Sequence, residues 1–432
     1  MAKSSNRKKY TEGISGKKPL RVPITNAYSG NDYSATVLIG SEKIPVNVLL
    51  DTGSSTFAVS PSAYDGLKDT LAQPTTYAQV VQYGTGGWAG PLVNTLMTIG
   101  HEKDSISLRR SHIAITTVEE KNNFVGVHGI IGLAYNGLNM AYDLKSVLPK
   151  SGSQFSHPWP FKSKNFNAFN QKFQKLMGAN EIPQKGVVPY FTELEEEGVV
   201  ANKFAFYTLR SRTRHATKDK SKAVSDPFNN GFFIIGGGEE QTDLYMGGLD
   251  SFMIAEVYHH LYYNTNLKTV QVDGCDPIEA RPLQKKFIGS SVSNSIIDTG
   301  TNRLCLANDV YRYIMKSFKK INPSFIELIR ESDEQKMGLD AKKLDLADWP
   351  EIHFTFSGEG RKDIRLTCTP DTYWQLFTPT YNRAVFQITG PEDSQNQSVF
   401  GLPLLNNYYT IFDRSVHEHG VIRFAPIKKI QQ

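Results

Sequence analysis

The sequence predicts a mainly β protein built from two similar lobes related by a pseudo-twofold axis. Alternating runs rich in Val, Ile and Phe recur along the chain, as at residues 35–39 and 352–356, and period-two alternation is typical of half-buried strands. A second observation is a phrase that occurs twice, at 49–54 and 296–301: two apolar residues, Asp-Thr-Gly, then a hydroxyl residue. Finally, 432 residues with 39% hydrophobic content are enough for two lobes with separate cores.

Few helices are expected between the strands. Residues 165–177 carry phenylalanines close to 3.6-residue spacing, which predicts an amphipathic helix. Residues 191–198 form a short acidic segment that ends in glycine. Residues 308–319 carry apolar side chains on one side and begin with Asn308, which we expect to be the N-cap.

Two stretches are predicted to be surface insertions. Residues 151–184 mix Ser, Pro, Asn and Lys around the expected phenylalanine-rich helix. Residues 210–230 are rich in Arg, Lys and Ser and nearly free of large apolar side chains. The basic run at 210–214 has a charge that suits an acidic partner, but charged loops are usually solvated, and we predict a solvated surface there.

The bulk composition excludes several classes of function. A balance of 48 basic against 43 acidic residues gives a net charge of +5, too mild to indicate nucleic acid. No uncharged apolar run is long enough to span a bilayer. We therefore expect a soluble monomer without a nucleic-acid or membrane partner. The histidines lack a His-Glu-x-x-His pattern, so we expect neither a metal nor another cofactor.

The number and position of the cysteines indicate the cellular compartment of the protein. Cys275, Cys305 and Cys368 are odd in number and lie in the second half of the chain, which disfavours a disulfide framework. Cys305 stands between two leucines and is predicted to be a buried structural thiol. We expect a reducing, cytoplasmic compartment, with secretion left open in case an export signal is missing from the given chain.

The repeated motif contains the candidate catalytic residues. It places Asp51 and Asp298 at the ends of buried strands, immediately before a sharp turn at a glycine. Two carboxylates that face each other cannot both ionise comfortably, so they share a proton, and one acts as base while the other acts as acid. Each half also contains a later strand in which two apolar residues precede a glycine, at 130–132 and 399–401.

With these motifs in this order, the sequence resembles the pepsin-like aspartic endopeptidases from about residue 22 to residue 426. The resemblance implies a bilobal fold with a tail at 1–21, an N-terminal lobe at 22–209 and a C-terminal lobe at 210–432. It implies that Asp51 and Asp298 form a catalytic dyad in the cleft between the lobes. The residues expected to support the dyad are Thr52, Gly53, Ser54, Thr299, Gly300 and Thr301. The residues expected in a substrate-covering flap are Tyr83, Gly84, Thr85 and Gly86, and those expected to line the cleft are Leu49, Ile130 and Ile296.

One departure from the family pattern concerns the flap. Ala58 stands where the family usually has a tryptophan that supports the flap tyrosine, and Trp88, just after the flap turn, is the candidate to compensate. The glycines around the turn resemble a dinucleotide loop only superficially, because Pro91 and the lack of a following helix predict a hairpin.

The expected function is hydrolysis of peptides or unfolded proteins between hydrophobic residues at acidic pH. An alternative enzyme class is an actin-fold ATP-dependent phosphotransferase, in which two Asp-x-Gly loops hold phosphates. That fold requires long helices and a first loop very near the N-terminus, whereas Asp51 follows a tail. A further alternative is a non-catalytic peptide-binding protein on a protease scaffold. Loss of one aspartate would indicate it, and both are present.

Overall fold

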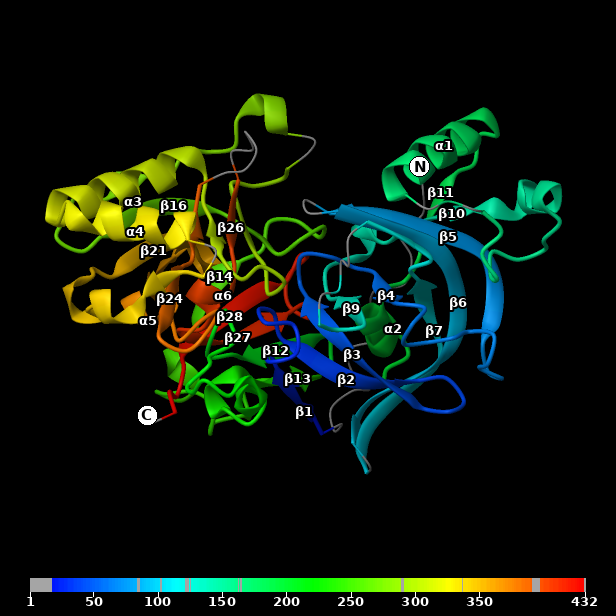
Figure 1. Ribbon diagram of the computed structural model, residues 1–432, viewed down its shortest axis with the longest axis horizontal. Helices are drawn as coiled ribbons and strands as arrows, with labels where there is room; N and C mark the ends of the chain where they lie inside the picture. Colours follow the sequence, from blue (N-terminus) through cyan, green and yellow to red (C-terminus); the bar gives the residue numbers. More distant parts are fainter. Residues whose placement is uncertain are drawn as a thin grey trace.

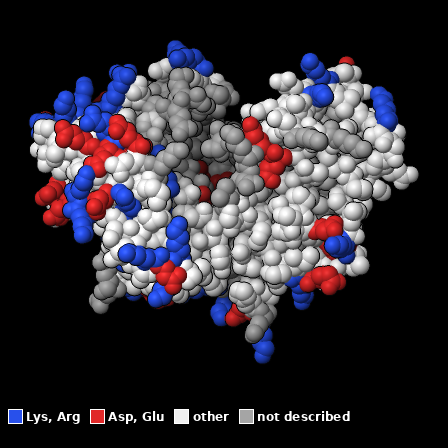
Figure 2. Space-filling model, viewed as in Figure 1, with Lys and Arg blue, Asp and Glu red and all other residues white. Residues whose placement is uncertain are grey.

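The computed structural model describes residues 18–83, 86–101, 103–120, 124, 126–161, 163, 165–288, 291–335, 337–390 and 397–430, without the side chains of Tyr83 and Arg361. Two lobes stand side by side above a shared base of strands (Figure 1). The surface is hollowed between the lobes, with acidic atoms visible at the floor of the hollow (Figure 2). The predicted mainly β, bilobal architecture is confirmed.

The largest sheet forms the N-terminal lobe and continues into the base. Its strands lie in the spatial order β11 (Gln184–Gly186), β10 (Met140–Asp143), β5 (Gln73–Tyr83), β6 (Gly86–His101), β7 (Asp104–Ile115), β4 (Phe57–Val59), β9 (Gly129–Gly132), β3 (Ile44–Asp51), β2 (Ser34–Ile39), β1 (Leu20–Thr25), β13 (Asn230–Ile235), β12 (Lys203–Tyr207), β27 (Tyr408–Asp413), β28 (Val421–Pro426) and β14 (Met253–Glu256). The short strand β8 (Val118–Glu119) pairs with β6 beside this path.

Smaller sheets make up the C-terminal lobe. One has the order β15 (Asn264–Thr265), β18 (Ser295–Ile297), β26 (Ser398–Phe400), β19 (Leu304–Cys305) and β25 (Ile388–Thr389). Another has the order β17 (Ile278–Glu279), β16 (Leu267–Val272), β21 (Ile352–Ser357) and β22 (Asp363–Cys368). A third has the order β20 (Leu339–Asp340), β24 (Arg383–Phe386) and β23 (Trp374–Leu376).

The base joins the two lobes through antiparallel pairing. Strand β1 pairs with β13 along its whole length, from Leu20 opposite Ile235, and β12 pairs with β27. Leu20 and Arg21, the last residues of the predicted tail, are therefore already in the sheet, and Arg21 Nη1 lies 2.7 Å from Asp243 Oδ2. The boundaries at 21/22 and 209/210 stay predictions, since this sheet runs through both lobes.

The α-helices are α1 (Phe166–Ala179), α2 (Tyr190–Glu196), α3 (Asn308–Ile321), α4 (Ser324–Glu334), α5 (Pro370–Tyr373) and α6 (Leu402–Leu405). Helices α1, α2 and α3 agree with the predicted helical segments, whereas α4, α5 and α6 were not predicted. The predicted N-cap of α3 is wrong: Ala307 is the cap, without a side-chain bond, because its backbone is the last with extended geometry. Helix α4 was not predicted, because its short apolar side is interrupted by charged residues.

The stretch at 151–184 is not only a surface insertion. Helix α1 begins at the N-cap Asn165, whose side chain accepts from the Ala168 N–H, and its phenylalanines are buried. They form an apolar cluster against β5 and β6. The ring of Phe166 lies so close to Gly87 that a Cβ there would overlap it. The helix therefore packs beside the end of the β5–β6 hairpin.

The prediction of a solvated surface at 210–214 is wrong. Arg210 is 9% exposed and Ser211 is fully buried. Arg212 donates from Nε to Gln387 and from Nη1 to Asn31, at 3.0 Å in each case. The run passes between the N-terminal residues and β23–β24, and its polar groups bond to buried partners there. Composition could not show this, because arginines with such partners have the same sequence pattern as solvated ones.

None of the three cysteines, all of which are described, forms a disulfide. Cys368 is fully buried, whereas Cys305 is only partly buried between the buried Leu304 and Leu306, so the prediction of a buried Cys305 holds only in part. Among the described residues, no helix has both the length and the apolar character needed to cross a membrane.

Candidate active site

Asp51 and Asp298 occupy equivalent places in the two lobes. Asp51 ends β3, which runs parallel to β9 with Leu50 opposite Ile131, and Asp298 follows β18, which runs parallel to β26. The apolar-apolar-glycine motifs thus lie beside the Asp-Thr-Gly strands in both halves, as the resemblance implied. Because Leu50, Asp51 and all residues of β9 and β18 are buried, the strand ends hold each carboxylate at a fixed place between the lobes.

Both carboxylates are held by their own loops in the same way. Asp51 accepts from the Gly53 N–H at 2.7 Å and from the Ser54 hydroxyl at 2.5 Å. Asp298 accepts equivalent bonds from Gly300 N–H and Thr301 hydroxyl, at 2.9 and 2.6 Å. Four donors therefore orient two carboxylates that are only 8% and 9% exposed. The resemblance implied Ser54 and Thr301 as residues that support the dyad, and their hydroxyls make these contacts.

The two loops touch through their glycines. A Cβ built on Gly53 would lie 2.7 Å from both carboxylate oxygens of Asp298, and one built on Gly300 would overlap Asp51 Oδ1. Thr52 and Thr299 bond to each other beneath the carboxylates. Glycine is therefore required at both positions for the carboxylates to approach across the axis.

The electrostatics of the pair favour a retained proton. Burial, and next the charge of Asp298, raise the pKa of Asp51 well above its usual value, while the Ser54 hydroxyl and the Gly53 N–H act in the opposite direction. Two carboxyl groups coupled this closely titrate as a unit, and the pair retains one proton over the pH range between its two ionisations.

Further side chains near the dyad were not predicted. Burial, followed by the charge of Asp298, raises the pKa of Asp32 to about 7, against the lowering effects of Arg212 and a hydrogen bond from Asn302. Burial and the charges of both dyad residues also raise the pKa of Tyr262. Asn302 directly follows Thr301, so its proximity could have been read from the motif. Asp32 and Tyr262 had no such signal, because only the packing of distant loops brings them here.

The predicted flap is only partly described. Strands β5 and β6 form the expected antiparallel hairpin, with Tyr83 opposite Gly86. Gly84, Thr85 and the side chain of Tyr83 lie outside the described residues. Trp88 is fully buried in the apolar cluster that contains Ala58. The indole thus shares a cluster with the alanine that replaces the family's usual tryptophan.

The residues predicted to line the cleft are mostly buried. Ile130 and Ile296 are 6% and 8% exposed, and Leu49 is half-buried against the same cluster as Ile130. Their role in binding substrate stays a prediction, because these exposures also suit plain core positions.

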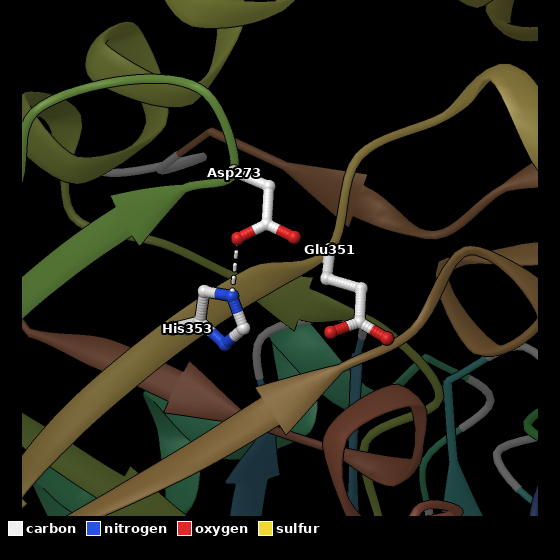
Figure 3. A group of neighbouring side chains, drawn as sticks. All are labelled: Asp273, Glu351 and His353. Atoms are coloured by element: carbon white, nitrogen blue, oxygen red, sulfur yellow. Dashed lines mark hydrogen bonds and ion pairs between the residues drawn. The ribbon is translucent and has the colours of Figure 1, made fainter.

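One group of potential metal ligands lies away from the dyad. Ligating atoms of Asp273, Glu351 and His353 lie within 4.8 Å of one another, where the paired strands β16 and β21 bring them together (Figure 3). His353 Nε2 lies 2.7 Å from Asp273 Oδ1, and Nδ1 lies 2.9 Å from the Thr367 hydroxyl. Since both imidazole nitrogens have protein partners, the contacts describe a local hydrogen-bonded group on the sheet. The expectation that the protein needs no metal stays a prediction.

The comparisons with known proteins agree with this geometry. The model of the family described as eukaryotic aspartyl protease matches residues 32–151 and 162–426. The gap between the two matched stretches falls inside the predicted insertion at 151–184. The chain is 22% identical over 417 residues to Pepsin-2B of Gadus morhua, covering 91% of this chain and 96% of that protein. The chain belongs to the eukaryotic aspartyl protease family and is an aspartic-type endopeptidase, a hydrolase that acts on peptides or proteins.

Proposed function

We propose that Asp51 and Asp298 together activate a water molecule that hydrolyses peptide bonds, with a preference for large hydrophobic residues on both sides of the cut, at acidic pH. The observation that carries the proposal is the mutual approach of two buried carboxylates, each packed against the glycine of the opposite loop. The actin-fold phosphotransferase is not favoured, because the family match covers both lobes. The non-catalytic alternative is not favoured either, because both carboxylates have a full set of donors.

The proposed reaction uses one proton held by the pair. A water molecule between the carboxylates loses a proton to the ionised member and attacks the carbonyl carbon, while the protonated member donates to the carbonyl oxygen. The elevated pKa of Asp51, caused first by burial and then by Asp298, supports Asp51 as the member that holds the proton. The donors to both carboxylates keep their outer oxygens in place through this exchange.

The substrate preference rests on the apolar character of the predicted cleft residues. Leu49, Ile130 and Ile296 carry no charge, so we expect no anchor for a charged side chain beside the scissile bond. We propose that the β5–β6 hairpin closes over the bound peptide and excludes water. We also propose that the protein acts as a monomer and that it works in a reducing compartment. The lack of a disulfide among its three cysteines supports the compartment.

Cleavage of a denatured protein at acidic pH, without added metal or nucleotide, tests the function. We expect activity that a statine-type transition-state mimic abolishes and that a metal chelator leaves unchanged. A peptide library then tests the preference beside the cut. A dominant basic or acidic preference would contradict the proposed cleft, and loss of activity with the chelator alone would contradict the metal-free mechanism.

A further inference from the structure

A second cavity lies in the C-terminal half, away from the dyad. It has a volume of about 240 Å³ and is bounded by the beginning of the 210–230 segment, by α5 and by residues 429–430 near the C-terminal end of the described chain. We call it the basic pocket. Aromatic rings come from Phe228 and Phe377, and the polar lining consists of Arg210, Arg214, Lys429, Asp371, Thr372 and Asn406. None of the Asp-Thr-Gly loop residues lines it.

Arg210 brings to this pocket a buried positive charge that no carboxylate of the described residues contacts directly. Its side chain donates to the Arg212 carbonyl at 3.4 Å and to the Leu376 carbonyl at 2.5 Å. Burial, and next the charge of Arg214, lower the pKa of Arg210 to about 10 against the raising effects of Tyr33, Asp226 and Asp371, so it remains protonated at neutral pH. Across the described part of the chain, no carboxylate lies within ion-pairing distance of it. A buried charge without a direct ion-pair partner is costly, and an anion in the cavity would lower that cost.

The other charges in the pocket already have partners. Arg214 pairs with Asp226 at 2.8 Å, and Lys429 pairs with Asp371 at 2.8 Å. The pocket therefore carries net positive charge, and the unpaired part belongs to Arg210.

The side chain of Asn406 requires hydrogen-bond partners that a simple anion cannot provide. Its side chain is 2% exposed, and both Nδ2 and Oδ1 lack a hydrogen-bond partner among the described residues. Buried amides in folded proteins are almost always bonded. A ligand that presents an acceptor beside a donor would satisfy both atoms at once.

The aromatic side chains that line the basic pocket favour a ligand with a planar ring. The rings of Phe228 and Phe377 both lie near the Arg214 guanidinium, with centroids at 5.0 and 5.3 Å from its central carbon. The volume is below the roughly 300–1,000 Å³ of pockets for drug-sized ligands, which limits the occupant to about one ring.

We infer that the basic pocket binds a small planar organic carboxylate, whose anionic group pairs with Arg210 and whose opposite edge offers neighbouring N–H and C=O groups to Asn406. The two interactions come from residues in different segments, so only a ligand with both groups satisfies the pocket. The inference is independent of the proposed peptidase mechanism.

Calorimetric titration of the full chain with orotate tests the proposal, because orotate is a single ring with a carboxylate and adjacent N–H and C=O groups. Uracil is the matched probe without the carboxylate, and inorganic phosphate is the probe without the ring. We expect saturable binding of one orotate per chain, with uracil and phosphate each at least tenfold weaker. Absence of saturable orotate binding by the folded protein would overturn the proposal and indicate that the pocket holds water only.

Variants assign the two contacts. Asn406→Leu removes two unpaired polar atoms, so the protein should remain folded, and we expect orotate binding to weaken by about tenfold or more. Arg210→Met should weaken orotate binding at least as much. If this variant does not fold, the weaker binding of uracil by the wild type tests the contribution of the carboxylate instead. Lys222→Met removes an exposed charge from the same segment and should bind orotate like the wild type. Unchanged binding by Asn406→Leu, or equal binding of orotate and phosphate, would reduce the pocket to a non-selective anion site and overturn the proposal.

Discussion

The backbone N–H of Thr52 donates to the Thr299 hydroxyl at 3.0 Å, and the backbone N–H of Thr299 donates to the Thr52 hydroxyl at 2.9 Å. Each hydroxyl in turn donates to a carbonyl of the opposite strand, Ile297 O at 3.3 Å and Leu50 O at 2.9 Å. Both threonines are buried. The two Asp-Thr-Gly loops are therefore joined directly beneath the carboxylates, and the position of one dyad residue depends on the loop of the other lobe.

Thr52→Val should destabilise the protein by about 2–4 kcal/mol, because it leaves the Thr299 N–H and the Ile297 carbonyl buried without partners. The isosteric side chain keeps the packing, so the loss reports on the hydrogen bonds. Urea unfolding measures the effect. The exposed Thr217→Val is the control and should change stability by less than about 0.5 kcal/mol. Equal stability of Thr52→Val and wild type would contradict the structural role of the cross-link.

Asp51→Asn and Asp298→Asn should each reduce kcat by about 10³-fold or more, because an amide can neither share nor accept the proton. The amide has the shape of the carboxylate, so both variants should fold normally by circular dichroism. The control Asp250→Asn, on the exposed surface, should retain full activity. Single variants that cleave at the wild-type rate would remove the dyad assignment.

Ser54→Ala should move the alkaline limb of the pH–rate profile upward by about one unit. The Ser54 hydroxyl opposes the rise in the pKa of Asp51, so its removal makes the pair retain its proton to higher pH. Measurement of kcat/KM between pH 3 and pH 8 shows the limb. Ser54→Thr keeps the hydroxyl and should restore the wild-type profile, whereas a shift in the threonine variant too would point to packing.

Asp32→Asn should stabilise the protein above pH 7 and should change its stability little at pH 4. Burial and then the charge of Asp298 raise the pKa of Asp32 from 3.8 to about 7. A carboxyl group whose folded pKa is raised contributes stability at low pH, and that contribution disappears as the pH rises through the folded value. Urea unfolding at pH 4 and pH 8.5 should show an additional gain for the variant on the order of 2 kcal/mol at the higher pH. An equal difference in unfolding free energy between variant and wild type at both pH values would contradict the raised pKa of Asp32.

Phe166→Ala should raise KM for peptide substrates severalfold, because the ring lies against Gly87 beside the end of the β5–β6 hairpin. We also expect a loss of about 3–5 kcal/mol in stability, as is usual for removal of a buried phenylalanine. Steady-state kinetics and thermal unfolding measure the two effects. Leu67→Ala, at a side chain that is 68% exposed, is the matched control. An unchanged KM would show that helix α1 does not contribute to substrate binding by the hairpin.

The sequence by itself determined the parts of this protein that depend on local pattern. Period-two alternation predicted β2 and β21, and the phenylalanine spacing predicted α1. The repeated Asp-Thr-Gly phrase predicted which carboxylates carry donors from their own loops, because those bonds span only two or three residues. Such features follow from backbone geometry over a single turn or strand, which neighbouring residues specify.

Tertiary structure alone decided which distant residues became neighbours. It placed Asp32 and Tyr262 near the dyad, and it buried Arg210, which its basic surroundings had assigned to the solvent. The charge of an arginine indicates that it needs a partner, but the partner depends on how strands and loops from both ends of the chain pack together. Short-range pattern has no information about that packing, because the same residues would satisfy their hydrogen bonds equally well in water.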